Sequence, residues 1–212
     1  MFATDRDLLA LEPNLFKDIA WAGQRLILCT GSIAGTTLTI TPGDADFTAA
    51  QIAPGHVALV DGIPYEVVEV LTSTTATISR LRPDPTGPVL PPDAGTGLVV
   101  SISSFAPQLS LVHNQVLRLL DIEPSDPDAV PSESSIINAR ALIPIECVTA
   151  LHLIYTAAAA LATPGSTLWH RVAHYRQRIN EERPRVAALI DLDNDGHPDA
   201  TRRLSTFALL RA

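Results

Sequence analysis

One short segment of this 212-residue sequence has the residue types and the spacing that bind a hard cation. In DLDNDGHPDA, residues 191–200, carboxylates recur at every second position, and Gly196 follows where the backbone has to turn sharply. The candidate ligands are Asp191, Asp193, Asp195, the backbone carbonyl of His197, and Asp199. They match the first nine positions of an EF-hand loop, in which carboxylates and one carbonyl surround Ca²⁺. We predict one structural Ca²⁺ here and no other cofactor.

The twelfth position of this segment excludes a complete EF-hand. That family places a bidentate Glu there, whereas this sequence has Arg202. Four carboxylates and a carbonyl leave coordination positions for water or for a ligand from another subunit. The alternative to a metal site is an acidic turn, in which the Asp side chains only cap the backbone that follows a helix.

No other segment predicts reaction chemistry. HRVAH places His170 and His174 one helical turn apart, as in zinc proteases, but Arg171 stands where those enzymes have a catalytic Glu. The sequence contains no motif for a nucleophilic serine or a phosphate-binding loop. Glu66 and Glu69 lie three apart on an expected strand, so they point to opposite faces and do not form a catalytic pair. We therefore expect a protein that is not an enzyme.

The composition is that of a folded protein with an uneven charge. Hydrophobic residues make up 46% of the sequence, and the formal net charge is −8. Residues 1–139 contain 6 basic and 16 acidic residues, whereas residues 140–212 contain 9 and 7. An acidic chain without basic, aromatic-rich patches does not read DNA sequence. Arginine accounts for 14 of the 15 basic residues, and its planar group favours fixed contacts, so we expect arginines at interfaces.

Cysteine usage and hydropathy indicate a protein of a reducing compartment. Cys29 and Cys147 fit neither a zinc motif nor a disulfide framework, so we expect two buried free thiols. The opening residues carry charges every few positions and lack the pattern of a secretory signal. The longest apolar run, residues 150–162, is shorter than a membrane span and contains His152. We expect no export and no membrane partner.

Residues 22–105 have the alternating pattern of short β-strands. Their β-branched runs are separated by Gly, Pro, Asp and Ser. Asp61 and Gly62 join two of these runs as a two-residue hairpin turn. Five or so short strands in about eighty residues favour a small antiparallel barrel or sandwich over a parallel sheet. Residues 82–97 contain too much Pro and Gly for regular structure, so we expect a long exposed loop there.

From residue 106 onward the apolar residues recur at helical spacing. The buried face of the first helix is predicted to comprise Leu109, Val112, Val116, Leu119 and Leu120. A second helix is expected over residues 141–162. A third begins near Ser166 and is bent or broken near its end by Pro184. Its apolar positions are Trp169, Val172, Ile179 and Leu189.

These patterns predict an α+β fold, a helical bundle with a small antiparallel β-barrel or sandwich inserted into it. We expect four segments along the chain. They are an N-terminal helical segment over residues 1–21, the β module over 22–105, the helical bundle over 106–190, and an Asp-rich turn with a C-terminal arm over 191–212.

The helical half carries a combination of motifs that points to a family. An Ala-rich helix contains Ile154 and Tyr155, the next helix contains Tyr175, Arg176 and Arg178, and the Asp-rich turn leads into a short apolar tail over residues 203–211. In this it resembles the head-to-tail connector, or neck adaptor (head completion), proteins of tailed bacteriophages. The opening MFATDRDLLALEPNLF also resembles the start of such proteins. On this resemblance the β module is an insertion into a helical connector bundle.

The resemblance implies a structural virion protein in the neck, made in the host cytoplasm. Such adaptors form a ring, usually of about twelve copies, beneath the portal protein, extend the DNA channel and meet the next neck or tail-completion protein. DNA passes through without sequence recognition, because an acidic lining repels its phosphates. The residues expected at subunit or portal contacts are Arg176, Arg178, Arg183, Leu204, Phe207 and Leu209.

Two other function classes stay open. A calcium-dependent surface or carbohydrate-binding module would bind its ligand on the barrel and use the Asp-rich turn as its functional site. Its weakness is the aromatic content of only 5%, because sugar-binding faces usually stack Trp or Tyr on the sugar. A metal-assisted hydrolase would need an open coordination position beside a pocket and a base, and the sequence identifies neither.

Overall fold

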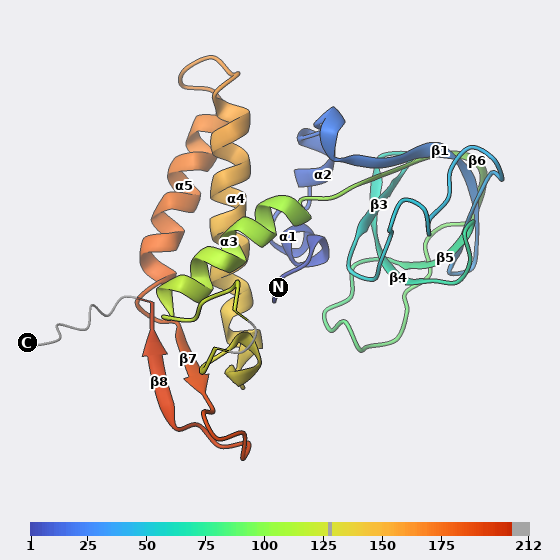
Figure 1. Cartoon of the computed structure of the whole chain (residues 1–212). Helices are drawn as coiled ribbons and strands as arrows, with labels where there is room; N and C mark the ends of the chain where they lie inside the picture. Colours follow the sequence, from blue (N-terminus) through green and yellow to red (C-terminus); the bar gives the residue numbers. More distant parts are fainter. Residues whose placement is uncertain (127–128, 205–212) are drawn as a thin grey trace, which may run out of the picture. The chain divides into compact units, whose positions relative to one another are not determined.

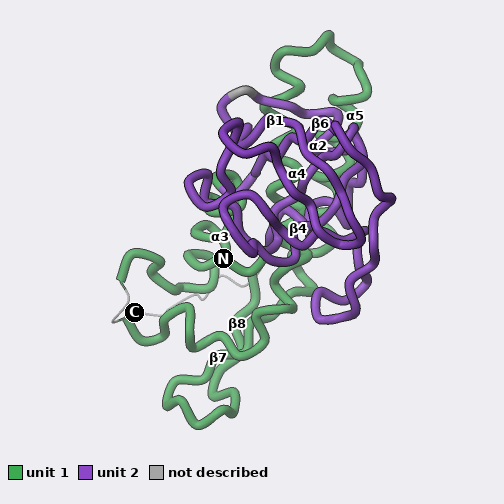
Figure 2. The backbone as a smooth tube through the Cα atoms, turned by 90° about the vertical axis from the view of Figure 1, so that its right-hand side faces the viewer, with its two compact units in different colours: residues 1–3, 107–212 green, residues 4–106 purple. Residues whose placement is uncertain are grey.

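The computed structural model describes residues 1–126 and 129–204 and has the α+β fold that the sequence predicts (Figure 1). The chain forms two compact units, coloured separately in Figure 2. One comprises residues 4–106 and is called here the barrel unit. The other comprises residues 1–3 and 107–212 and is called the helical unit.

Six antiparallel strands close into a barrel in the order β1-β2-β5-β4-β3-β6. The strands are β1 (Arg25–Ala34), β2 (Thr37–Ile40), β3 (Val57–Val60), β4 (Ile63–Val70), β5 (Thr75–Ser79) and β6 (Gly95–Ser103). Closure leaves no unpaired edge, which resolves the predicted choice between barrel and sandwich in favour of the barrel. The loop over residues 80–94, between β5 and β6, contains no helix or strand and is largely exposed, but the predicted loop over residues 82–97 is too long, because β6 already begins at Gly95.

The barrel interior is filled by side chains from alternate positions along the strands. On β1, Ile27, Cys29 and Ile33 point inward, and the residues between them are mostly exposed. Phe47, from the segment between β2 and β3, is fully buried in the same core. The predicted hairpin turn is confirmed, because Asp61 and Gly62 both have positive φ, as a type I′ turn requires, and Val60 pairs with Ile63 across it.

The first helices belong to the barrel unit. Helices α1 (Asp5–Leu11) and α2 (Leu15–Asp18) contact β3, and a 3₁₀ turn, η1 (Ala22–Gln24), leads into β1. Arg6 of α1 donates to the buried carboxylate of Glu66 on β4, and Arg82 donates to the other oxygen of the same carboxylate. The N-terminal helical segment is therefore tied to the barrel by a buried ion cluster of two arginines and one glutamate.

The helical unit contains three longer helices and a β-hairpin among its described residues. Its elements are α3 (Ala106–Leu119), η2 (Glu133–Ser135), η3 (Ala139–Leu142), α4 (Ile143–Ala159), α5 (Thr167–Glu182), β7 (Ala187–Ile190) and β8 (Ala200–Arg203). Helices α4 and α5 form a hairpin and pack along each other, and β7 pairs with β8 in antiparallel register (Figure 1). Pro144 lies in the first turn of α4, where the missing N–H is tolerated.

Two helix predictions need correction. The third helix ends at Glu182, just before Pro184, so Leu189 lies on β7 rather than on a helix face. Arg183 still has helical dihedral angles, but Pro184 has no N–H to continue the hydrogen-bond ladder, so the helix is broken there, as predicted. In α3, Leu119 is 46% exposed and Leu117 is buried in its place, because the helix ends at Leu119 and the chain turns at Asp121, which has positive φ.

The helical stretch Ala139–Ala159 is long and apolar enough to cross a membrane by length and composition. It is longer than the apolar run recognised in the sequence because η3 continues into α4. Half of its most apolar window is buried inside the protein. Cys147 on α4 is one of these buried residues and, like Cys29 in the barrel, forms no disulfide.

Candidate functional site

The Asp-rich turn connects the two strands of the β7–β8 hairpin. Ile190, the last residue of β7, is fully buried and pairs with Ala200, the first residue of β8, so the nine residues 191–199 form the connection. Asn194 and Gly196 adopt positive φ, which allows the chain to fold back over a short distance. The paired strands therefore fix both ends of the turn.

Asp191 organises the backbone of the turn. Its Oδ1 accepts a hydrogen bond from the N–H of Asn194 at 2.7 Å, and its Oδ2 accepts one from the N–H of Gly196 at 2.8 Å. Desolvation acts to raise the pKa of Asp191, but these hydrogen bonds, with one from Asp195, outweigh it and hold the pKa below its usual value. The carboxylate is therefore charged at neutral pH.

Three carboxylates of the turn converge closely enough to bind one cation. One oxygen each from Asp191, Asp193 and Asp195 lies within 4.8 Å of the others. Desolvation and the negative charges of Asp195 and Asp199 raise the pKa of Asp193 above its usual value. A cation at this position would relieve the repulsion. The Asp triad can hold a metal ion, which agrees with the sequence prediction for three of its five ligands.

The other two predicted ligands have different roles in this structure. Asp199 accepts a hydrogen bond from the N–H of Leu192 at 2.7 Å and so closes the base of the turn. His197 donates its N–H to Asp195 at 2.7 Å. Arg202, at the twelfth position, donates to the backbone carbonyls of Leu120 and Asp121 and is not a ligand. Metal binding by Asp199 and by the His197 carbonyl stays a prediction.

The structure brings no second metal-ligand cluster together within residues 1–126 and 129–204. His174 packs edge-on against Tyr175 on the same helix, with the ring centroids 5.2 Å apart, and joins no group of three potential ligands with His170. In the part of the chain that is described, the Asp triad is the group of ligands that the fold assembles.

A tyrosine pair joins α4 to α5. The rings of Tyr155 and Tyr175 stack with their centroids 5.6 Å apart and their planes 5° from parallel, and both side chains are buried. Arg171 lies over the ring of Tyr155, 5.3 Å from its centroid, and donates to its hydroxyl oxygen at 3.1 Å. Stacking and cation-π contact at a buried joint fix the packing of the two helices.

The predicted contact residues are found in different environments. Arg176 is exposed on α5, whereas Arg178 and Arg183 are half-buried. Arg183 donates from Nε to the backbone carbonyl of Leu204 at 2.9 Å, and the Leu204 side chain is buried within the helical unit. These two residues thus stabilise the end of β8 in the chain itself. Phe207 and Leu209 lie outside the described residues.

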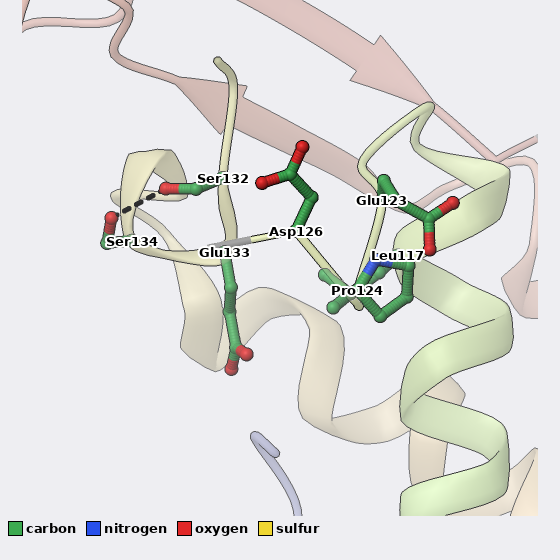
Figure 3. Close-up of a pocket in the computed structure, with 7 residues that line it drawn as sticks. All are labelled: Leu117, Glu123, Pro124, Asp126, Ser132, Glu133 and Ser134. Atoms are coloured by element: carbon green, nitrogen blue, oxygen red, sulfur yellow. Dashed lines mark hydrogen bonds between the residues drawn. The ribbon is translucent and has the colours of Figure 1, made fainter. Parts of the chain in front are cut away.

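An acidic cavity of about 240 Å³ lies beside the end of α3. Its charged lining residues are Glu123 and Asp126, from the segment after α3, and Glu133 of η2 (Figure 3). The side chains of Asp126 and Glu133 point in different directions in this view, and the three carboxylates do not form a metal-ligand group. This cavity was not predictable from the sequence, because its residues are spread over a loop with no motif.

The sequence analysis also missed a buried glutamate in the helical unit. Glu146 on α4 is fully buried and accepts hydrogen bonds from Nδ1 of His113 at 2.7 Å and from the N–H of Ala3 at 2.8 Å. The other ring nitrogen of His113 lies 3.2 Å from Glu133. A Glu inside the apolar sequence IPIECVTALHL was the available signal, because a buried carboxylate requires partners.

No protein-family model, no curated protein and no solved structure matches this chain.

Proposed function

We propose that this protein is a neck adaptor, a structural virion protein without enzymatic activity that forms a ring under the portal and joins head to tail. The observation that carries the proposal is the tyrosine joint between α4 and α5. Tyr155 and Tyr175, two positions of the adaptor-like motif that are 20 residues apart in sequence, stack on each other in the core. Motif residues that contact each other in the structure are more specific for the adaptor family than the same residues taken separately.

The surface of the helical unit is consistent with assembly. Beside the joint, Arg176 remains on the exposed side of α5, where a partner can reach it. Leu111, Leu161 and Trp169 are large apolar residues at 65%, 90% and 43% exposure. In a ring, neighbouring subunits or the portal would cover such residues.

The proposed role of the Asp triad is structural. We propose one Ca²⁺ held by Asp191, Asp193 and Asp195, with water or a neighbouring subunit completing its coordination. The ion would neutralise three like charges at the tip of the β7–β8 hairpin and hold the turn in one conformation. Asp199 and the carbonyl of His197 are the further candidate ligands.

Native mass spectrometry of the purified chain, alone and mixed with a portal protein, tests the adaptor proposal, with electron microscopy of the same sample. We expect a ring of about twelve copies, stacked on the portal ring. A chain that stays monomeric and does not bind portal contradicts the proposal. If such a monomer bound calcium tightly, the calcium-dependent binding module would become the better proposal.

A further inference from the structure

The solvent side of α5 has the composition of a binding surface. Trp169, Ala173, Arg176 and Asn180 are spaced four, three and four residues apart, so they share one face of the helix, and all four are exposed. Tyr175 packs on the opposite side against α4. Trp and Arg are the residue types most enriched among the anchors of protein interfaces. We call these four residues the α5 face.

Arg176 makes this face positive. Desolvation and the positive charge of Arg176 lower the pKa of His152 on α4 below its usual value. An exposed guanidinium presents five donors in a planar fork, which suits carboxylates. The chemistry of the α5 face therefore calls for an acidic surface on the partner, with an apolar part that covers Trp169.

The acidic cavity beside α3 offers that chemistry on the same unit. Glu133 is held by His113 and by the ammonium group of Met1, and the exposed Glu123 and Asp126 add negative charge to the lining. Leu117 and Pro124 supply apolar lining. Its volume of about 240 Å³ equals the share of about eight water molecules in the liquid, enough for a guanidinium group. Its carboxylates do not form a metal-ligand group.

We propose that the α5 face docks on a second copy of this chain, with Arg176 entering the cavity lined by Glu123 and Asp126 of that copy. Complementary charge on two different patches makes the contact head-to-tail, so each copy uses its α5 face toward one neighbour and its cavity toward the other. Contacts of this kind close into rings when the rotation between copies permits. The inference rests on the proposed function and names the surfaces that would build its ring.

Paired charge reversals test the contact. R176E and E123R are prepared separately, and each is measured by native mass spectrometry alone and in an equal mixture. Alone, each variant meets like charge at every contact, and we expect self-association to weaken at least tenfold. In the mixture, an assembly in which the two variants alternate pairs opposite charges at every contact. We therefore expect assembly to return, with the two variants in a 1:1 ratio.

Matched controls separate a lost contact from a lost fold. R140E and E69R make the same charge changes at other exposed positions and should assemble like the unmodified chain. D126R replaces E123R if the latter has a lower melting temperature. Assembly of R176E at the unmodified level overturns the inference, as does a mixture of folded variants that fails to recover.

The outcomes also separate this inference from the adaptor proposal. A ring on the portal that is insensitive to R176E and E123R overturns the contact and leaves the adaptor function standing. A chain that neither self-associates nor binds portal overturns both. A third outcome is a chain that remains monomeric and binds acidic peptides, with the binding lost in R176E. It would assign the α5 face to a different protein partner and overturn the self-contact.

Discussion

Each unit holds one glutamate almost completely away from solvent, Glu66 at 1% exposure and Glu146 at 0%, and the two are neutralised in different ways. In the barrel unit, Glu66 is held between the guanidinium groups of Arg6 and Arg82. In the helical unit, Glu146 is held by the imidazole of His113 and by backbone N–H groups. Arginine stays charged at every accessible pH, whereas histidine loses its charge near neutrality. The partners of Glu66 therefore keep their charge as the pH changes, whereas the histidine partner of Glu146 loses its charge as the pH rises.

The largest effect is expected from removing the barrel glutamate. E66A leaves two guanidinium groups near each other in the protein interior without their shared counter-charge. Breaking a buried ion cluster in this way costs about 3–5 kcal/mol of unfolding free energy. Urea unfolding followed by fluorescence measures the change. E69A, on the same strand but exposed, is the control and should change stability by less than about 0.5 kcal/mol. An equally small change in the unfolding free energy of E66A would contradict the role of Glu66 as the shared counter-charge of the two arginines.

Asp5 gives the barrel unit a pH response of its own. The carboxyl is buried, and desolvation raises its pKa to about 6 against the hydrogen bonds from Ser104 and Phe105. Since the folded pKa lies above the unfolded value of 3.8, stability falls as the pH rises from about 4 to about 6. D5N imitates the protonated acid, keeps an acceptor for Phe105, and should stabilise the barrel unit by about 2 kcal/mol at pH 7.

Unfolding curves of unmodified chain and D5N at pH 4 and pH 7 provide the measurement. The two proteins should differ much less at the lower pH, where Asp5 is protonated in the folded state and partly protonated in the unfolded state. A stabilisation of D5N that is the same at both pH values would show that the carboxyl does not titrate in this window.

His113 gives the helical unit a pH response at higher pH than the response that Asp5 gives the barrel unit. Desolvation acts to lower its pKa, but the hydrogen bond and the charge of Glu146, with Glu133, outweigh it and raise the pKa above 6.5. The ammonium group of Met1 acts in the opposite direction. Because the folded pKa is raised, the stabilisation is complete below pH 6.5 and is lost as the pH rises through the folded pKa.

H113Q should flatten this upper part of the pH profile. The amide keeps a polar group beside Glu146 but cannot titrate, so we expect a loss of about 1–2 kcal/mol at pH 6 that shrinks toward pH 9. Melting temperatures from pH 5 to pH 9 measure it. If the melting temperature of H113Q changes with pH in parallel with that of the unmodified chain, His113 is not the titrating group.

The smallest effect on stability is expected from calcium. The Asp triad is largely exposed and has neither buried arginine partners, as Glu66 has, nor a buried histidine partner, as Glu146 has. At a free concentration ten times its dissociation constant, Ca²⁺ should stabilise the helical unit by about 1.4 kcal/mol. The melting temperature in calcium and in chelator gives the shift, and D193A should abolish it. Mg²⁺, which demands tighter octahedral geometry, is the control ion. Identical melting curves in calcium and chelator would exclude the structural metal.

Much of the fold was predictable because periodicity reports burial directly. The strands of the barrel and the Asp61–Gly62 turn follow from local pattern. The extra strand β7 did not, since Leu189 continues a helical spacing and only the Pro184 stop, together with pairing to β8, decides its conformation.

The candidate site was predictable only where it is local in sequence. The Asp triad lies within five consecutive residues, and its convergence follows from the turn. The buried clusters join residues far apart, such as Arg6 with Glu66, 60 positions away, and His113 with Glu146, 33 positions away. Arg82 stood in a segment that reads as an exposed loop, yet it is buried. Pairings of this kind depend on tertiary packing, which no single stretch of sequence encodes.

The distribution of the two cysteines gives each unit its own chemical reporter. Cys29 lies in the barrel core and Cys147 on α4 in the helical unit, and both are buried and outside any disulfide. A thiol-reactive probe added in short pulses during denaturation would modify each position only when the surrounding unit opens. Peptide mapping of the modified protein would then give the order in which the two units lose their structure, without any engineered label.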